Sequence, residues 1–244
     1  MDKQEVAFRD LGQMAYKEAW DYQEQLLQQA VAIKTALRNQ ADDGITSLLE
    51  TGHHLLFVEH PPVYTLGKSG DLSNVLLSED EMSERGIGFY KINRGGDITF
   101  HGPQQLVGYP ILDLEKFYTD IGRYLRNIEE VIIRVLAEYG IESGRSPGET
   151  GVWIDADKKG QERKICAIGV RSSRWVTMHG FALNVNTDLS YFDNIIPCGI
   201  KDKQVTSLEK ELGHPVSMDE IKKKVKRHFE DIFGVILVSA DRLT

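Results

Sequence analysis

The feature that most constrains the fold is a series of strand-like segments between residues 53 and 186, which a single helical segment interrupts. Each segment is short, rich in β-branched or aromatic residues and bounded by turn-forming residues, a pattern typical of β-strands. Strands in consecutive blocks with few helices between them predict an α+β fold with a mixed or largely antiparallel sheet. The predicted strands are residues 55–59, 89–93, 97–101, 106–112, 151–155, 164–170 and 177–186.

Three longer segments repeat apolar side chains at steps of three and four residues, which predicts amphipathic helices at 13–39, 120–139 and 218–233. Gly140 follows the second helix, where a C-terminal glycine is favoured. Ser217 precedes the third helix and Glu220 stands three residues later, as in a capping box. The sequence contains no repeat and no low-complexity linker, so residues 1–244 are predicted to form a single domain.

The composition excludes several classes of protein. Lys and Arg number 29 against 37 Asp and Glu, and the net charge of −8 argues against general nucleic-acid binding. The two cysteines form no CxxC pair, which excludes a disulfide scaffold and a thiolate zinc site. No apolar run reaches 18 residues and the first residues lack a signal-peptide core, so we expect a cytoplasmic protein without a membrane span.

The common nucleotide-binding and hydrolase motifs are absent: there is no P-loop, no dinucleotide-binding glycine motif, no nucleophile elbow and no HExxH. His53, His54 and His60 lie close together in the sequence. The adjacent pair would point to opposite faces of a strand, so these histidines favour buried or loop positions over a shared metal. We therefore predict no metal site.

Three segments carry candidate chemistry. In residues 94–105 two glycines follow an arginine. This run either leaves backbone N–H groups open to a ligand or forms a hairpin turn. Thr99 and His101, further along, would share one face of a strand. In residues 163–170 Lys164 stands at the mouth of an apolar strand, where it is either readied for proton transfer or extended into solvent. In residues 194–200 Cys198 lies in a turn, either as an exposed nucleophile or as an inert apolar residue.

A fourth segment, residues 178–184, adds another His-Gly pair on a predicted strand. Small residues at Gly169, Gly180 and Ala182 leave space beside the sheet, either for a linear acyl chain or for close packing of a strand against a helix. A reactive thiol needs a nearby cation or base, and Lys164 is the candidate for Cys198 although 34 positions separate them.

Taken together, these segments resemble the octanoyltransferase family, the lipoyl(octanoyl) transferases of lipoate synthesis. The run RGGDITFHGP followed by QLVGYPILDL is similar to the central signature of that family, and HPPVYTLG at residues 60–67 is similar to an upstream motif. KICAIGVR, HGFALNV and IPCGI follow in the family's order, so the resemblance covers about residues 53–212. It implies the fold shared by biotin and lipoate ligases, a mixed sheet flanked by helices.

The resemblance also implies an activity. Octanoyl would pass from octanoyl-acyl carrier protein to a lysine on the lipoyl domains of 2-oxoacid dehydrogenases or on the glycine cleavage H protein, without ATP, metal or another cofactor. Cys198 would form an acyl-thioester, and Lys164 would keep the thiol deprotonated and carry protons. The implied acyl pocket comprises Arg94, Gly95, Gly96, Asp97, Ile98, Thr99, Phe100, His101, Ala167, Ile168, Gly169, His179, Gly180, Phe181 and Ala182.

Two positions depart from the pattern of that family. Gln104 stands where the family has a glycine, which puts the local loop geometry in doubt because a side chain disfavours conformations that glycine adopts freely. Cys166 stands where the family often has alanine; as a strand cysteine it is expected to be packed, although on a regular strand it shares a face with Lys164. A second thiol near the site is therefore an alternative to be tested, with Cys198 favoured as the nucleophile.

Other functions remain open at this point. An ATP-dependent lipoate–protein ligase would form an acyl-adenylate and would not need Cys198, a non-catalytic acyl-carrier-binding module needs no thiol, and a thioesterase would pass the acyl group to water. Two basic groups bear on docking of acidic proteins: Lys158, Lys159, Arg163 and Lys164, and the run at residues 222–227. The second group is alternatively a solvated helix face.

Overall fold

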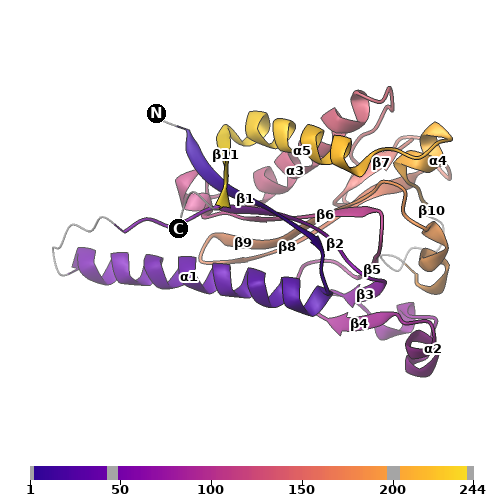
Figure 1. The fold of residues 1–244 in the computed structure, drawn as a ribbon, viewed down its shortest axis with the longest axis horizontal. Helices are drawn as coiled ribbons and strands as arrows, with labels where there is room; N and C mark the ends of the chain where they lie inside the picture. Colours follow the sequence, from indigo (N-terminus) through magenta and orange to yellow (C-terminus); the bar gives the residue numbers. More distant parts are fainter. Residues whose placement is uncertain (1–2, 43–48, 197–203, 241–244) are drawn as a thin grey trace.

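The main sheet of the protein is mixed, as the sequence predicts (Figure 1). The computed structural model describes residues 3–42, 49–196 and 204–240. Within these residues eight strands form the main sheet, in the order β10-β8-β9-β6-β2-β1-β11 with β7 paired to β8. They are β1 (Gln4–Gln13), β2 (His54–Glu59), β6 (Gln105–Ile111), β7 (Val152–Ile154), β8 (Arg163–Ser173), β9 (Val176–Asn184), β10 (Gln204–Val205) and β11 (Val235–Ser239). β1 is parallel to β2 and β11, β10 is parallel to β8, and the other pairs are antiparallel.

A second, smaller sheet stands at one end of the molecule. It has the order β4-β3-β5, formed by β3 (Val63–Leu66), β4 (Gly88–Lys91) and β5 (Ile98–His101), and helix α2 (Glu79–Glu84) contacts β4. The β3–β5 register sets Thr65 opposite Thr99 and Val63 opposite His101. This pairing brings the HPPVYTLG segment against the RGGDITFHGP segment, although about 30 residues separate them.

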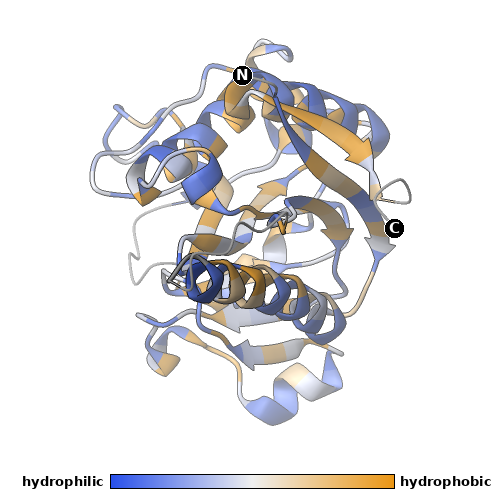
Figure 2. Ribbon diagram, turned by 90° about the vertical axis from the view of Figure 1, so that its left-hand side faces the viewer, coloured by the Kyte–Doolittle hydropathy of each residue, from blue (hydrophilic) through white to orange (hydrophobic). Residues whose placement is uncertain are grey.

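Helices cover both faces of the main sheet (Figure 1). α1 (Tyr16–Asp42) lies along one face and packs on β9 and β6, while α3 (Ile121–Ala137) and α5 (Met218–Phe233) pack together on the other. Short helices connect these elements: α4 (Leu208–Leu212) and 3₁₀ turns at Leu72–Asn74, Leu114–Lys116 and Leu189–Asn194. Coloured by hydropathy, α1 carries hydrophilic and hydrophobic residues along its length (Figure 2). Its apolar stripe, Ala19, Leu26, Leu27 and Ala30, is buried against the sheet, which accounts for the helix by burial of one face.

The predicted helices and strands are found with small shifts of their ends, and the single-domain α+β fold is confirmed. The segment 155–161 joins β7 to β8, which pair antiparallel. The predicted strand at 164–170 is longer, running to Ser173. Strands β1, β3, β10 and β11 and helices α2 and α4 were not predicted. Among the described residues, none of the helices has the length and apolar character needed to cross a membrane.

Candidate functional site

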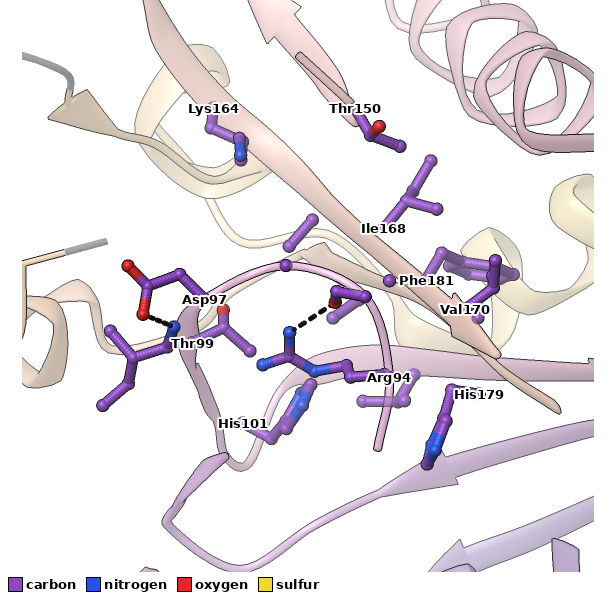
Figure 3. Close-up of a pocket in the computed structure, with 18 of the residues that line it drawn as sticks. Arg94, Asp97, Thr99, His101, Thr150, Lys164, Ile168, Val170, His179 and Phe181 are labelled. Carbon is purple, nitrogen blue, oxygen red and sulfur yellow. Dashed lines mark hydrogen bonds between the residues drawn. The ribbon is translucent and has the colours of Figure 1, made fainter. Parts of the chain in front are cut away.

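A cavity of about 640 Å³ opens between the main sheet, α1 and the loop that follows β4 (Figure 3). Its floor is the sheet, where β6, β8 and β9 contribute side chains, and its roof is the segment 94–97. Lys164 of β8 lies at one side of the cavity, and the more enclosed end is formed by Arg94, Tyr109, His101 and His179. The lining is mostly apolar with a few polar groups, which is typical of a small-ligand site.

The roof is fixed by a buried arginine. Arg94, 8% exposed, donates from its guanidinium to the Thr65 carbonyl oxygen at 2.7 Å and to Thr65 Oγ1 at 3.0 Å. The Gly67 N–H donates to the Asp97 carbonyl, and the Gly95 N–H donates to the Val170 carbonyl at 2.9 Å. The arginine-glycine-glycine loop therefore joins the end of β3 to the outer edge of β8 and closes the cavity between them.

The end of the HPPVYTLG segment needs its glycine because the roof approaches too closely for a side chain. A Cβ atom added to Gly67 would lie 2.2 Å from the Gly96 carbonyl oxygen, which is backbone and cannot move aside alone. We expect Gly67→Ala to lower the free energy of unfolding by about 1–3 kcal/mol, the usual cost of overpacking. Gly144→Ala is the matched control because no atom lies within 4 Å of its added Cβ. Thermal or urea unfolding measures both; equal small effects would contradict the close approach at Gly67.

The small residues of β8 and β9 are explained mainly by close packing of backbone. A Cβ on Gly169 would lie 2.9 Å from Arg94 Cδ and from the Gly95 carbonyl oxygen, and one on Gly180 would lie 2.1 Å from the Gly108 carbonyl oxygen. Of the two alternatives, close packing therefore applies to both glycines, against the roof loop and a neighbouring strand rather than a helix. Both still line the cavity, together with Ala167 and Ala182.

Two buried neutral histidines lie at the enclosed end of the cavity: His101 lines it, whereas His60 contacts the lining residue Tyr109. His60 donates from Nδ1 to the Met14 carbonyl at 2.9 Å, so its Nε2 accepts from the Tyr109 hydroxyl at 2.7 Å. His101 donates from Nδ1 to Gln105 Oε1 at 2.9 Å. Burial lowers the pKa of His60 to about 4 and, helped by the charge of nearby groups, the pKa of His101 well below its ordinary value. This end of the cavity therefore presents uncharged polar groups around the Arg94 guanidinium.

His179 adopts an unusual conformation for a strand residue. Its φ is +58°, in the left-handed region, and its backbone N–H donates to Gln23 Oε1 of α1 at 2.9 Å. The register of β9 with β6 ends at Phe181, so His179 lies beyond the paired part of these two strands. The buried Gln23 side chain therefore takes the hydrogen bond that the neighbouring strand does not provide, and the side chain of His179 turns toward the cavity, where it contacts Asn93.

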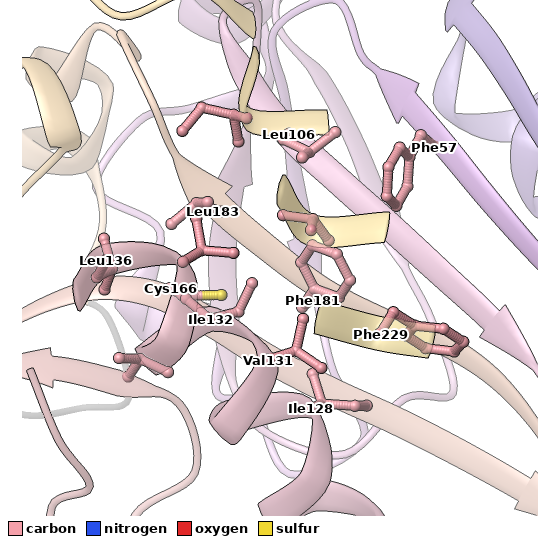
Figure 4. Packing of buried hydrophobic residues seen from close by; sticks show 14 of the residues in the cluster. Phe57, Leu106, Ile128, Val131, Ile132, Leu136, Cys166, Phe181, Leu183 and Phe229 are labelled. Carbon is pink, nitrogen blue, oxygen red and sulfur yellow. The ribbon is translucent and has the colours of Figure 1, made fainter. Parts of the chain in front are cut away.

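Lys164 and Cys166 lie in different surroundings although they are two residues apart. Lys164 Nζ lies 4.6 Å from the centroid of the Trp153 ring, and Lys164 lines the cavity. Cys166 is fully buried among side chains of the apolar core, near Ile132 and Leu183 (Figure 4), and burial raises the pKa of its thiol. It does not line the cavity, so the alternative of a second thiol at the site is wrong.

The other predicted site residues are placed as follows. Every predicted pocket residue except Phe100 lines the cavity. Neighbouring residues of a strand point to alternate faces, and Phe100 lies on the other face of β5. Its ring stacks on the ring of Tyr191, with centroids 4.5 Å apart. Cys198 lies outside the described residues. Residues outside the predicted pocket set also line the cavity: Tyr16, Ser69, Gln105, Val107, Tyr109, Ile121, Leu125, Gly148, Glu149, Thr150, Val170, Asn184, Phe192 and Val205. Of these, Gln105, Val170 and Asn184 lie within the segments that the sequence marked as candidates.

Gln104 adopts the left-handed conformation that a glycine would take more freely. Its φ is +60°, and hydrogen bonds hold it on several sides. Its N–H donates to Glu59 Oε2 at 3.0 Å, and its carbonyl accepts from the Asn186 N–H and from Thr187 Oγ1 at 3.1 Å each. Gln104 therefore adopts a left-handed conformation although it is not glycine, and these hydrogen bonds offset the conformational cost.

Most of the basic groups considered for partner docking form ion pairs within the chain. Arg163 pairs with Asp155 and Glu211, and Lys158 pairs with Asp155. On α5 three cationic side chains are paired similarly, Lys222 with Asp10, and Lys224 and Arg227 with Glu138. These pairs weaken the case for either group as a docking surface. In residues 3–42, 49–196 and 204–240 no three His, Cys, Asp or Glu side chains are gathered to hold a metal ion.

Comparison with known proteins gives a consistent family. Residues 15–230 match the family described as the lipoyl protein ligase A/B catalytic domain. An octanoyltransferase of Flavobacterium johnsoniae is 59% identical over 96% of this chain and 98% of that protein, and one of Cytophaga hutchinsonii is 54% identical over 98% and 97%. Among solved structures, a bipartite lipoate protein ligase from Thermoplasma acidophilum aligns with a TM-score of 0.67 over 97% of this chain and 86% of that chain, at 17% identity, which shows a shared fold.

Proposed function

This chain belongs to the lipoyl protein ligase A/B catalytic domain family, and on that premise we propose that it moves octanoyl from octanoyl-acyl carrier protein to a lysine of a lipoyl domain. It is an octanoyltransferase, an acyltransferase of lipoate biosynthesis, as its close relatives are. The proposed acceptors are the lipoyl domains of 2-oxoacid dehydrogenases and the glycine cleavage H protein. The proposed location is the cytoplasm, and the proposed catalytic domain is residues 1–244.

The observation that carries the proposal is the cavity with Lys164 at its side. Its floor of Val107, Ala167 and Ala182 and its roof of backbone suit an unbranched hydrocarbon chain, which needs apolar walls and few polar groups. The proposed acyl pocket uses the predicted residues apart from Phe100. An acyl chain lying along this floor would bring its carbonyl carbon toward Lys164, where the proposed acyl transfer takes place.

We propose Cys198 as the nucleophile and Lys164 as its partner. The segment 197–203 is followed directly by β10, and Val205 of β10 pairs with Lys164. On the preceding side, the Ile196 N–H donates to the Asn74 carbonyl at 2.8 Å. The chain thus leaves this segment beside Lys164, which supports the pairing of the two residues.

The proposed reaction has two acyl transfers. In the first, the Cys198 thiolate attacks the carbonyl carbon of the octanoyl thioester; a new C–S bond forms, the bond to the carrier sulfur breaks, and the carrier leaves as a thiol after taking a proton from Lys164. In the second, the amine of the acceptor lysine attacks the acyl-enzyme. An amide forms, the thiolate returns, and Lys164 accepts the proton that the amine loses. A thioester is already activated, so the proposal needs no ATP.

Intact-mass measurement after mixing the protein with octanoyl-acyl carrier protein tests this proposal. The wild type is expected to gain one octanoyl group that hydroxylamine releases, and Cys198→Ser is expected to gain none. Cys166→Ser is the matched control, because the Cys166 thiol is buried away from the cavity and should leave the adduct unchanged. An adduct that survives in Cys198→Ser, or no adduct in the wild type, would contradict the proposed nucleophile.

The same reaction distinguishes the remaining alternatives. A lipoate–protein ligase would need ATP and magnesium to transfer free octanoate, and a thioesterase would release octanoate at full rate without any lipoyl domain. A binding module would do neither. We expect transfer to an added lipoyl domain with the thioester donor alone.

A further inference from the structure

The cavity has a larger volume than an octanoyl chain needs. Eight carbons need about 240 Å³ if each takes roughly the 30 Å³ of a water molecule in the liquid, against about 640 Å³ in the cavity. Part of the remaining space is lined by Ile168, Val170 and Thr150 (Figure 3), together with Leu125 of α3 and the rest of the loop at residues 148–150. A second hollow, of about 480 Å³, continues from the same loop to Arg126 and Arg145. The two hollows share the lining residues Gly148, Glu149 and Thr150, and we call the path along them from Lys164 to the two arginines the channel.

The side of this channel at β8 is an open strand edge. β7 pairs with β8 only as far as Cys166, and the roof loop meets the same edge at Val170, whose carbonyl accepts from the Gly95 N–H. Backbone groups alternate in direction along a strand, so the N–H and C=O of Ile168, between these points, face the channel. This edge offers one donor and one acceptor to an extended chain that contains amides.

The far end of the channel holds two arginines among three carboxylates, since Glu149 lines both hollows and Glu129 and Glu130 pair with the arginines. Arg126 pairs with the buried Glu129, and Arg145 pairs with Glu129 and Glu130, yet the side chains of Arg126 and Arg145 remain 43% and 35% exposed. A guanidinium has five N–H donors, so one ion pair leaves Arg126 with donors for a further anion. Arginine at an exposed site suits recognition of phosphate.

We propose that this channel, defined by Leu125, Ile168, Val170, residues 148–150, Arg126 and Arg145, binds the phosphopantetheine arm of the acyl donor. The inference rests on the proposed function, because it takes the donor to be a thioester of that arm. The apolar walls accept the dimethyl group, the edge at Ile168 hydrogen-bonds an amide, and the arginines bind the phosphate. The thioester end then lies at Lys164, and the octanoyl chain enters the acyl pocket.

A series of small donors tests the channel in the wild-type protein. Octanoyl transfer to a lipoyl domain is measured with octanoyl-phosphopantetheine, octanoyl-pantetheine and the octanoyl thioester of N-acetylcysteamine. We expect kcat/KM to fall at each truncation, by about tenfold when the phosphate is removed. Equal kcat/KM for all three donors would overturn the proposal while leaving octanoyl transfer in place. No transfer from any donor or from octanoyl-acyl carrier protein would instead overturn the proposed function, and this inference with it.

Variants then locate the phosphate. Arg126→Gln is expected to bring the ratio of kcat/KM for octanoyl-phosphopantetheine over octanoyl-pantetheine close to one. Arg134→Gln is the matched control, since Arg134 is on the same helix, pairs with Glu130 and is absent from both linings. The ratio is measured within one variant, so a change in the amount of folded protein does not affect it. An unchanged ratio in Arg126→Gln, or the same loss in Arg134→Gln, would overturn the assignment of the phosphate end.

Discussion

Between pH 6.5 and pH 5 the protein is expected to lose about 3–6 kcal/mol of its free energy of unfolding, because buried histidines must take up protons when the chain unfolds. Burial lowers the pKa of His53 and His60 to about 4 each, and burial together with the charges of Arg94 and Arg171 lowers the pKa of His179 to about 3. The loss is large against a typical stability of about 5–15 kcal/mol, so unfolding at mildly acidic pH is the expected result.

The direction follows from which state binds the protons. An unfolded histidine titrates near pH 6.5, whereas these three stay neutral in the fold down to pH 4 or below. Their contribution to stability is therefore complete above pH 6.5 and is lost as the pH falls toward the folded pKa values. Each contributes about 1–2 kcal/mol by pH 5, and the fully buried His101 changes stability in the same direction.

Urea unfolding at a series of pH values measures this loss and the number of protons taken up. His179→Asn is an informative variant, because asparagine tolerates the left-handed backbone at this position while it removes one titrating group, so the slope of stability against pH becomes shallower. His214→Gln is the control, since it also removes one histidine but at an exposed position. Stability that stays constant from pH 7 to pH 5 would show that these histidines are not held neutral by burial.

The parts of the fold that local sequence determines were predicted, and those that depend on distant partners were not. Helix α5 has its predicted bounds because its apolar stripe and the cap at Ser217, which accepts from the Glu220 N–H, are both local. Strand β1 mixes charged and apolar residues and is stabilised by parallel pairing with β2 and β11, which come about 50 and 230 residues later. No short window of sequence contains that information.

The same distinction applies to the site. The glycine-rich loop and the small residues of β8 and β9 were found from motifs, since their unusual composition is visible in the sequence. Tyr16 and Tyr109 were missed because they reach the cavity only through the placement of α1 on the sheet and the depth of the floor. The packing of Cys166 was predicted from its place on a strand and is confirmed, whereas its separation from Lys164 was not, since strand alternation alone left both on one side.

The second large effect is expected at Glu129, a fully buried carboxylate on α3 that fixes the loop beside the channel. It accepts from Arg126 at 2.8 Å, from Arg145 at 2.9 Å and from the Gly151 N–H at 3.0 Å. Glu129→Leu would leave the buried Gly151 N–H and the guanidinium groups of Arg126 and Arg145 without this acceptor. We expect a loss of about 3–4 kcal/mol, as for removal of one partner from a buried ion pair.

Glu129→Gln separates the charge from the shape of that side chain. The amide keeps one oxygen for Gly151 but turns an NH₂ group toward the arginines, so an intermediate loss of about 2 kcal/mol is expected. Glu130→Gln is the control on the same helix: its carboxylate is about one-third exposed and pairs with Arg134 and Arg145, so its loss should cost below about 1 kcal/mol. Hydrogen exchange at the Gly151 amide gives the local readout, because Glu129 is its acceptor. Unchanged protection of the Gly151 amide from exchange in Glu129→Leu would mean that Arg145 and the strand alone hold the loop. The buried carboxylate would then not stabilise the wall of the channel.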